Sequence, residues 1–355
     1  MKAGFGALEW RITTGWVVSR VARPGFSIHP PRKNITPSFV FCGHLGVESE
    51  LAWRWLPFPL HSGSRHDLKS GHLANMKHWR IEDVAWDQFD SMKVRRELVP
   101  LVKAAALVER NADDYAIYLG RVFSDDPEFR TAVERWSVEE VQHGDALGRW
   151  AMLADPGWDF EDAFARFRDG YRLPLDVDTS VRGSRTGELI ARCIVETGTS
   201  SYYTALAQTT AEPVMASICK LIAADEFRHF KLFYEHMRRY LDREHISFLQ
   251  RLRIAAGRIG ESEDDEMAFA FHCANKDVDA VYDHDRCIAT YLTTTLPIYR
   301  FGHIERGMGM VFKAVGLPPR GRLSDLSARL AWHLLQRRGR KLAERVWEPE
   351  WPRAA

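Results

Sequence analysis

The sequence predicts an all-α fold in which four long helices form one bundle. Three observations predict it. Apolar residues recur at helical spacing through four segments, at 101–122, 128–153, 187–210 and 213–241. Clusters of Asp, Pro and Gly separate these segments. A stretch at 155–186 without such periodicity lies between the second and the third, so the connections are short, long and short.

Local residues indicate where each helix begins and ends. Asp126 and Pro127 end the first segment, and Asp155 and Gly157 end the second. Pro213 stands at the start of the fourth segment, where the first turn of a helix accepts proline. Each short connection therefore joins an antiparallel pair of helices, and the long connection crosses over between the two pairs.

Additional helices are expected after the bundle. Further helical patterns occur near 246–258 and over 277–315, so we expect a bundle over 76–260 and C-terminal helices that pack on it over 261–355. The end of the chain is strongly basic at 337–341. We interpret this basic tail as a solvated helix face, and the alternative is a docking surface for an acidic partner.

The first 75 residues differ from the rest of the chain. They are basic and rich in Trp and His, and they show no sustained helical or strand period. We expect a poorly structured extension at 1–75. It could be a small domain or a targeting leader, but we favour a mis-assigned start with Met76 as the initiator, because the change in composition coincides with a methionine.

Composition excludes several classes of protein. A net charge of +1 argues against a basic nucleic-acid binder. The 5 cysteines are scattered, without a disulfide framework or paired zinc ligands, so a reducing cytoplasm is the expected compartment. No apolar run is long enough to predict a membrane span.

The motif Glu-x-x-His occurs twice, once in the second predicted helix and once in the fourth. Glu140 and His143 form the first copy, and Glu226 and His229 form the second. A spacing of three residues places the carboxylate and the imidazole on one helix face, where both can reach one metal ion.

A single glutamate precedes each motif in the neighbouring helix. Glu109 lies 31 residues before Glu140, and Glu196 lies 30 residues before Glu226. In two antiparallel hairpins of similar length, these intervals bring each glutamate level with its motif. The sequence therefore predicts a carboxylate-bridged di-iron site inside the bundle.

The chemistry of these residues agrees with that prediction. Glu109 and Glu196 follow apolar segments, and a buried carboxylate is costly unless a cation balances its charge. Carboxylate and imidazole ligands suit iron or manganese better than structural zinc. Asp113, one turn after Glu109, is a rival ligand, and we expect Glu139 to point away to the surface.

Two segments resemble the iron-binding motifs of a known family. The segment Trp136-Ser-Val-Glu-Glu-Val-Gln-His-Gly-Asp145 and the segment Ile222-Ala-Ala-Asp-Glu-Phe-Arg-His229 are similar to those of the soluble acyl-ACP desaturases, in the ferritin-like superfamily. The resemblance covers about residues 100–245. It implies a ferritin-like bundle with two Fe ions per chain, held by Glu109, Glu140, His143, Glu196, Glu226 and His229.

The same resemblance implies roles beyond the ligands. Asp225 would orient a ligating histidine, and the hydroxyl of Thr199 would lie near the oxygen-binding face. The expected activity is O2-dependent introduction of a double bond into a fatty acyl chain on acyl carrier protein or another acyl carrier. A ferredoxin-like donor would supply electrons, since no flavin or nicotinamide motif is present, and the resemblance implies a homodimer.

The same residues are compatible with other functions. One is a di-iron oxygenase that acts on an amine or an aromatic compound, and another is a ferroxidase or iron-binding protein. A bundle that binds no metal is the last alternative. An acyl chain would need an apolar channel, and the candidates to line it, which we otherwise interpret as bundle core, are Tyr202, Tyr203, Leu206, Phe227, Phe230, Phe233 and Tyr234.

Overall fold

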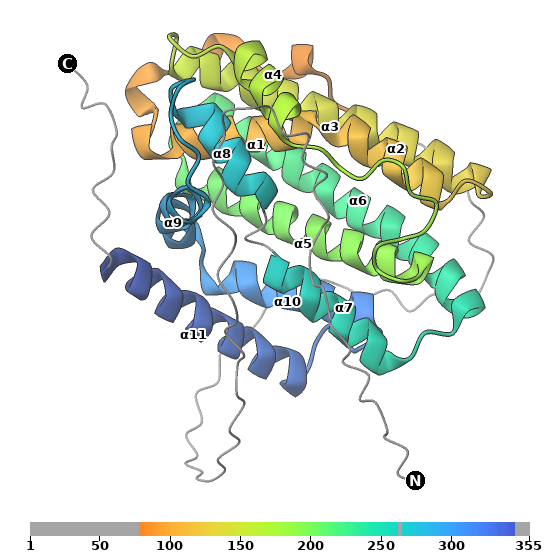
Figure 1. Ribbon diagram of the computed structural model, residues 1–355. Coiled ribbons are helices and arrows are strands. Elements are labelled where there is room, and N and C mark those ends of the chain that lie inside the picture. The colour runs from red at the N-terminus through yellow and green to blue at the C-terminus, as the bar shows by residue number, and fades with distance from the viewer. Residues whose placement is uncertain (1–77, 262–264, 345–355) are drawn as a thin grey trace, which may run out of the picture. The chain divides into compact units, whose positions relative to one another are not determined.

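The computed structural model describes residues 78–261 and 265–344, and within these ranges the chain is helical without any strand (Figure 1). The all-α prediction is therefore confirmed. The predictions for 1–75, including a start at Met76, lie outside the described residues. Among the helices that are described, none is both long enough and apolar enough to cross a lipid bilayer.

The described chain begins with a run of short turns that lies on the third helix of the fold. The side chain of Gln142 donates a hydrogen bond to the carbonyl oxygen of Trp79 (3.1 Å), and Arg149 lies over the ring of Trp86. Four 3-10 turns make up this run, at Ile81–Asp83, Trp86–Gln88, Ser91–Lys93 and Arg96–Leu98.

Two helices stand where the sequence predicts one at 101–122. They are α1 (Val99–Arg110) and α2 (Ala112–Val122), and the chain turns between them at Asn111. The backbone N–H of Asn111 donates to the carbonyl oxygen of Val108 (3.1 Å), three residues back rather than four. The prediction of one continuous helix is wrong here, because this tight turn interrupts the α-helical hydrogen-bond pattern.

The third helix of the bundle is α3 (Pro127–Ala154), which lies along α1 and α2. Its first turn has proline at N1, and Asp126 caps it by accepting a hydrogen bond from the N–H of Phe129 (3.0 Å). Asp126 also accepts hydrogen bonds from Tyr240 (2.8 Å) and Arg239, so this cap ties the start of α3 to a distant helix.

The second pair consists of α5 (Arg185–Thr209) and α6 (Pro213–Glu244), which lie along each other (Figure 1). Ser184 caps α5, and the buried carboxylate of Glu212 caps α6 by accepting from the N–H of Met215 (2.7 Å). Both caps satisfy backbone donors that have no partner within their own helix.

The long connection at 155–186 contains a helix that the sequence pattern did not indicate. This helix is α4 (Phe160–Gly170), capped by Asp159, and its Phe160 ring packs against Gly148 of α3. The crossover is thus partly ordered as a helix on the outside of the bundle.

Further helices follow the bundle, and the periodic stretch predicted at 277–315 is divided into two of them. A 3-10 turn with Pro297 at its centre separates them, because proline there cannot donate the hydrogen bond that would continue the helix. The elements are α7 (Phe248–Gly260), α8 (Asp265–Asn275), α9 (His284–Thr295), η6 (Leu296–Ile298), α10 (Phe301–Val315) and α11 (Arg322–Glu344).

The core of the bundle has two apolar clusters, one toward each end. One cluster includes Leu107, Trp150 and Ile222, and the other includes Phe129 and Phe233. Along α1 and α2, and along α3, α5 and α6, residues of one cluster are followed by residues of the other, and the change occurs near the middle of the bundle. The side chains at that changeover are polar and buried, which is where the candidate site lies.

Candidate metal centre

Six buried carboxylate and imidazole side chains meet in the polar layer between the two apolar clusters. α1 and α5 each contribute a single glutamate, whereas α3 and α6 each contribute a glutamate and a histidine one turn apart. They are the six residues that the sequence predicts: Glu109, Glu140, His143, Glu196, Glu226 and His229.

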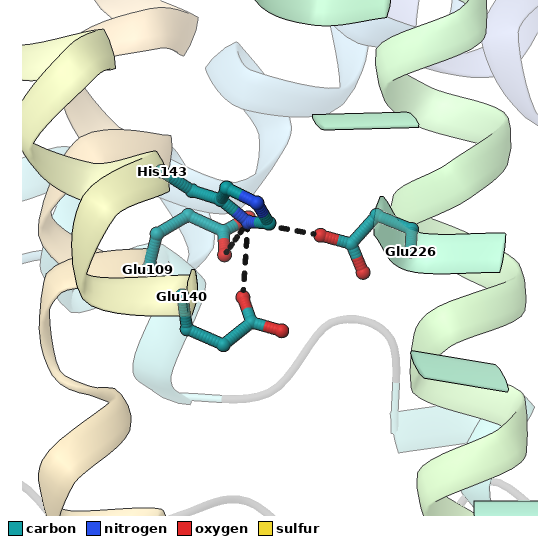
Figure 2. A group of neighbouring side chains, drawn as sticks. All are labelled: Glu109, Glu140, His143 and Glu226. Atoms are coloured by element: carbon teal, nitrogen blue, oxygen red, sulfur yellow. Dashed lines mark ion pairs between the residues drawn. The ribbon is translucent and has the colours of Figure 1, made fainter. Parts of the chain in front are cut away.

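These side chains form two overlapping groups, each able to hold one metal ion. In each group the potential ligand atoms lie within 4.8 Å of one another. Figure 2 shows the first group, in which His143 faces three carboxylates that converge on it. The first group is Glu109, Glu140, His143 and Glu226, and the second is Glu140, Glu196, Glu226 and His229.

Glu140 and Glu226 belong to both groups, and each directs its two oxygens to different histidines. Oε2 of Glu140 lies 3.4 Å from Nδ1 of His143, and its Oε1 lies 2.9 Å from Nδ1 of His229. Oε1 of Glu226 lies 3.4 Å from Nδ1 of His143, and its Oε2 lies 3.9 Å from Nδ1 of His229. These two carboxylates are therefore placed to bridge a pair of metal ions.

The remaining glutamates are terminal, one for each group. Oε2 of Glu109 lies 3.9 Å from Nδ1 of His143, and Oε2 of Glu196 lies 3.9 Å from Nδ1 of His229. An octahedral cation with bonds of about 2.1 Å holds adjacent ligand atoms about 3 Å apart and opposite ones about 4 Å apart. The observed separations fall in this range.

Buried ligand atoms without hydrogen bonds show that the residues fit a bound metal. Nδ1 of His143, Nδ1 of His229, Oε1 of Glu196 and Oε1 of Glu226 are buried and have no hydrogen-bond partner. Leaving such atoms unsatisfied is costly, and coordination of a cation would satisfy all of them. The orphaned atoms are on the ligand side of the site, which supports a metal centre over an ordinary polar core.

His143 is held in place by Asp225. Nε2 of His143 lies 3.0 Å from Oδ2 of Asp225, so a proton on Nε2 is shared with this carboxylate and Nδ1 is left to face the three glutamates of its group. The indole N–H of Trp79 donates to the same oxygen (2.8 Å), and its ring lies parallel to that of His143. The position that the resemblance implies for Asp225 agrees with this contact.

His229 is held in the same way by a residue that the sequence analysis placed on the surface. Nε2 of His229 lies 2.8 Å from Oε2 of Glu139, and Nδ1 again faces the carboxylates. Arg228 links the two supporting carboxylates, because it pairs with Glu139 (3.1 Å) and with Asp225. The surface assignment of Glu139 is wrong, since α6 packs on the side of α3 from which Glu139 projects.

Two hydroxyl groups contact the carboxylates directly. Oγ1 of Thr199 donates to Oε2 of Glu226 (2.7 Å), and the phenol of the buried Tyr203 donates to Oε1 of Glu109. Thr199 was predicted near the site, whereas Tyr203 was considered only as a channel or core residue. Its position about two turns after Glu196 on one helical face was the available signal.

The pKa values of the carboxylates differ between terminal and bridging residues. Burial raises the pKa of Glu109 well above its ordinary value, and the charge of Glu140 raises it further. Burial and the charge of Glu226 do the same to Glu196. Burial would also raise the pKa of Glu140, but the positive charge of His229 and the closeness of both imidazoles hold it well below its ordinary value.

The histidines compensate part of the negative charge. Burial disfavours the charged form of His143, but its hydrogen bond to Asp225 raises the pKa well above the ordinary value. For His229, burial is likewise outweighed by the charge of Glu140 and the hydrogen bond to Glu139, so the pKa is raised. Protons thus balance the carboxylates when no cation does, and a bound metal would replace them.

Asp113, the rival ligand, lies outside both groups. Its side chain is exposed and accepts a hydrogen bond from Ser137 (2.8 Å). The turn at Asn111 rotates the chain, so Asp113 no longer shares a face with Glu109. This is the physical reason why the spacing of one helical turn was misleading.

The candidate channel residues are mostly part of the core. Leu206, Phe230 and Phe233 are buried in the two apolar clusters, as their core interpretation expected. Phe227 lies under Arg306, and Tyr234 lies under Lys313. An open pocket of about 540 Å³ lies between α8 and α9, where His272 and Arg286 help to line it, and it contains none of the six ligand residues.

Comparison with models of protein families and with curated protein sequences finds no match to this chain.

Proposed function

We propose that this chain is a di-iron, O2-dependent oxidoreductase built on a ferritin-like four-helix bundle. One observation carries the proposal. Glu140 and Glu226 each direct one oxygen toward His143 and the other toward His229, so two ions would share both carboxylates. Two helical pairs with a crossover between them supply the ligands, as is usual for carboxylate-bridged iron sites in bundles.

The donor set supports iron. Four carboxylates and two neutral imidazoles balance the charge of two divalent ions, and no cysteine belongs to either described ligand group. Zinc sites that serve structure prefer thiolate ligands and closed coordination, whereas mixed oxygen and nitrogen ligands are typical of redox-active iron. When bound, the iron pair would supply the electron transfer that reduces O2, with electrons from an external donor such as a ferredoxin.

The surrounding side chains have defined tasks in this function. Asp225 and Glu139 hold the imidazoles so that Nδ1 points inward. Thr199 holds a proton at Oγ1, directed at Glu226, which belongs to both groups. The apolar clusters on both sides keep water away from the carboxylates, which strengthens every electrostatic interaction in the site.

A fatty acyl chain on a carrier is the substrate that we propose. The motifs around His143 and His229 support it through their similarity to the acyl-ACP desaturases. The reaction would remove two hydrogens from adjacent carbons of the chain, and O2 would take them up, together with two donor electrons and two protons from solvent, as two molecules of water.

Metal stoichiometry tests the centre. Anaerobic titration with Fe(II) should saturate at two ions per chain, and oxidation should produce the absorption of an oxo-bridged pair. Glu140→Ala should abolish this absorption, whereas Glu109→Ala should leave one ion per chain, because Glu109 belongs to one group only. Asp113→Ala is the control and should bind like the wild type. Intact oxo-bridged absorption in Glu140→Ala would disprove the assignment.

The substrate is tested separately. Lipids from a host that expresses the protein with an electron donor should contain new unsaturated acyl chains, and the Glu226→Ala variant should not produce them. Unchanged lipids together with rapid catalytic oxidation of Fe(II) would instead indicate a ferroxidase. This result would leave the metal centre intact and remove only the acyl substrate.

A further inference from the structure

The last described helix, α11, has an unusual surface, because four of its leucines face outward. Figure 1 shows α11 in dark blue beside α10 and α9, which it packs against. Small side chains and the ring of Trp332, which packs against Phe301 of α10, take part in that contact. Ser324 and Ala328 are buried, and Gly339 lies against Leu296 of η6.

Four leucines form a stripe on the opposite side of α11. Their exposed fractions are 59% for Leu323, 64% for Leu326, 56% for Leu330 and 55% for Leu334. Spacings of three, four and four residues align them along one face of a helix. A single exposed leucine needs no explanation, but an aligned row of them is typical of a surface that binds something apolar.

Basic side chains continue and border this stripe. Arg337 and Lys341 follow Leu334 by three and seven residues and so extend the same line. Further exposed arginines lie beside it. Among the residues of α11 whose side chains the structure describes, Asp325 is the acidic one, and it is exposed. We call the four leucines and their basic neighbours the leucine–arginine face; the neighbours are Arg322, Arg329, Arg337, Arg340 and Lys341.

We propose that the leucine–arginine face binds the surface of an anionic lipid bilayer. The leucines would enter the boundary between headgroups and acyl chains, and the arginines would pair with lipid phosphates. The helix would lie in the plane of the surface, since no described helix has the length and apolar character to cross a bilayer.

Charge favours this occupant over a second copy of the chain. Two such faces packed together would bring arginines against arginines in either orientation, and like charges at an interface are unfavourable. An anionic bilayer offers both an apolar layer for the leucines and phosphates for the basic groups. The proposal does not depend on the metal centre, because no ligand residue lies on α11.

Vesicle flotation of the full chain tests the proposal. The wild type should float with phosphatidylcholine vesicles that contain phosphatidylglycerol and should stay behind with phosphatidylcholine alone. Raised salt should weaken the binding, because it screens exposed charges. Equal binding to both kinds of vesicle would overturn the proposal.

Two double variants separate the apolar and the charged parts of the face. Leu326→Ser with Leu330→Ser should weaken binding to the anionic vesicles about tenfold or more, because less apolar surface is buried. Arg337→Glu with Lys341→Glu should have a similar effect of about tenfold through charge. The matched control is Leu249→Ser with Ile259→Ser, which removes exposed apolar residues from α7 instead and should bind like the wild type.

Sedimentation velocity of the same proteins completes the test. All variants alter exposed side chains, so each should fold and sediment like the wild type. A wild-type dimer that the leucine variant dissociates, together with no vesicle binding, would assign the face to a second copy and overturn the proposal. A monomer that binds neither kind of vesicle would overturn it as well, and an acidic protein would then be the partner to examine.

Discussion

At the scale of single residues, the centre depends on which nitrogen each histidine presents. Asp225 and Glu139 occupy equivalent places, one behind His143 and one behind His229, and each contacts Nε2. This arrangement selects the tautomer in which Nδ1 is free to bind a metal. Arg228 connects the two supporting carboxylates, so the orientation of both imidazoles is coupled.

Removing either supporting charge should weaken metal binding without removing a ligand. Asp225→Asn and Glu139→Gln should each lower the affinity for Fe(II) roughly 10- to 100-fold, because the imidazole loses its fixed orientation. Competition with a chelator measures the affinity. Glu134→Gln, at an exposed position of the same helix as Glu139, is the control and should change nothing. Wild-type affinity in both supporting variants would contradict the roles described for them.

At the scale of elements, two glycine positions show how closely the helices approach. A Cβ added to Gly144 of α3 would lie 2.6 Å from the backbone nitrogen of Arg110. Gly144 follows His143, and Arg110 follows Glu109, so the contact occurs where the two helices bring ligands together. A side chain at Gly120 of α2 would meet nothing within 4 Å.

Gly144→Ala should therefore destabilise the protein by about 1–3 kcal/mol, because α1 and α3 would be forced apart. Gly120→Ala should stabilise it by roughly 0.5–1 kcal/mol, since alanine loses less backbone entropy in a helix. Urea unfolding of both variants measures the free energies. Equal effects of the two substitutions would contradict a close approach at Gly144.

The cap of α3 should give the stability a pH dependence. Burial would raise the pKa of Asp126, but its hydrogen bonds from Phe129 and Tyr240 and the charge of Arg239 lower it. A pKa that is lower in the folded protein stabilises it above the unfolded value of about 3.9, and this contribution is lost as the pH falls through the folded pKa.

Asp126→Asn keeps an acceptor for the cap but removes the charge. At neutral pH it should cost about 1 kcal/mol, because Arg239 is partly exposed to solvent and the pairing is screened. The difference from the wild type should shrink below about pH 4. Thermal unfolding at a series of pH values measures it, and a difference that stays constant down to acidic pH would refute this role of the charge.

At the scale of the whole molecule, the described bundle combines two apolar clusters with a charged layer between them. The clusters stabilise the fold through burial, whereas the layer of carboxylates opposes it unless protons or cations balance the charge. The metal-loaded protein should therefore be more stable than the metal-free protein.

Metal binding should raise the unfolding temperature. At a free metal concentration a hundred times its Kd, binding should add about 2.7 kcal/mol to the free energy of unfolding. Glu196→Gln tests the cause. Without metal this variant should be as stable as the wild type or more stable, because a buried acid is replaced by a neutral side chain. With metal it should be less stable, since a terminal ligand is lost. Calorimetry with and without Fe(II) measures both, and a variant less stable than the wild type in both states by the same amount would contradict this account.

Much of the centre follows from the sequence because spacing in a helix determines direction. The two Glu-x-x-His pairs must each share a face, and the intervals from Glu109 and Glu196 bring the lone glutamates to the same depth. These relations hold for any pair of antiparallel helices with short turns. The sequence therefore predicts which residues meet and that the fold is helical.

Other features were decided only by the tertiary structure. Glu139 contacts a histidine because α6 covers its side of α3, and Asp113 lies outside the site because the chain turns at Asn111. Helical spacing encodes neither the covering helix nor the turn. Likewise, the four leucines of the leucine–arginine face have the spacing of a buried face, yet they are exposed and α11 packs through its other side. Periodicity shows which side chains share a face, whereas the packing of helices determines whether that face is turned toward a ligand, a neighbour or the surroundings.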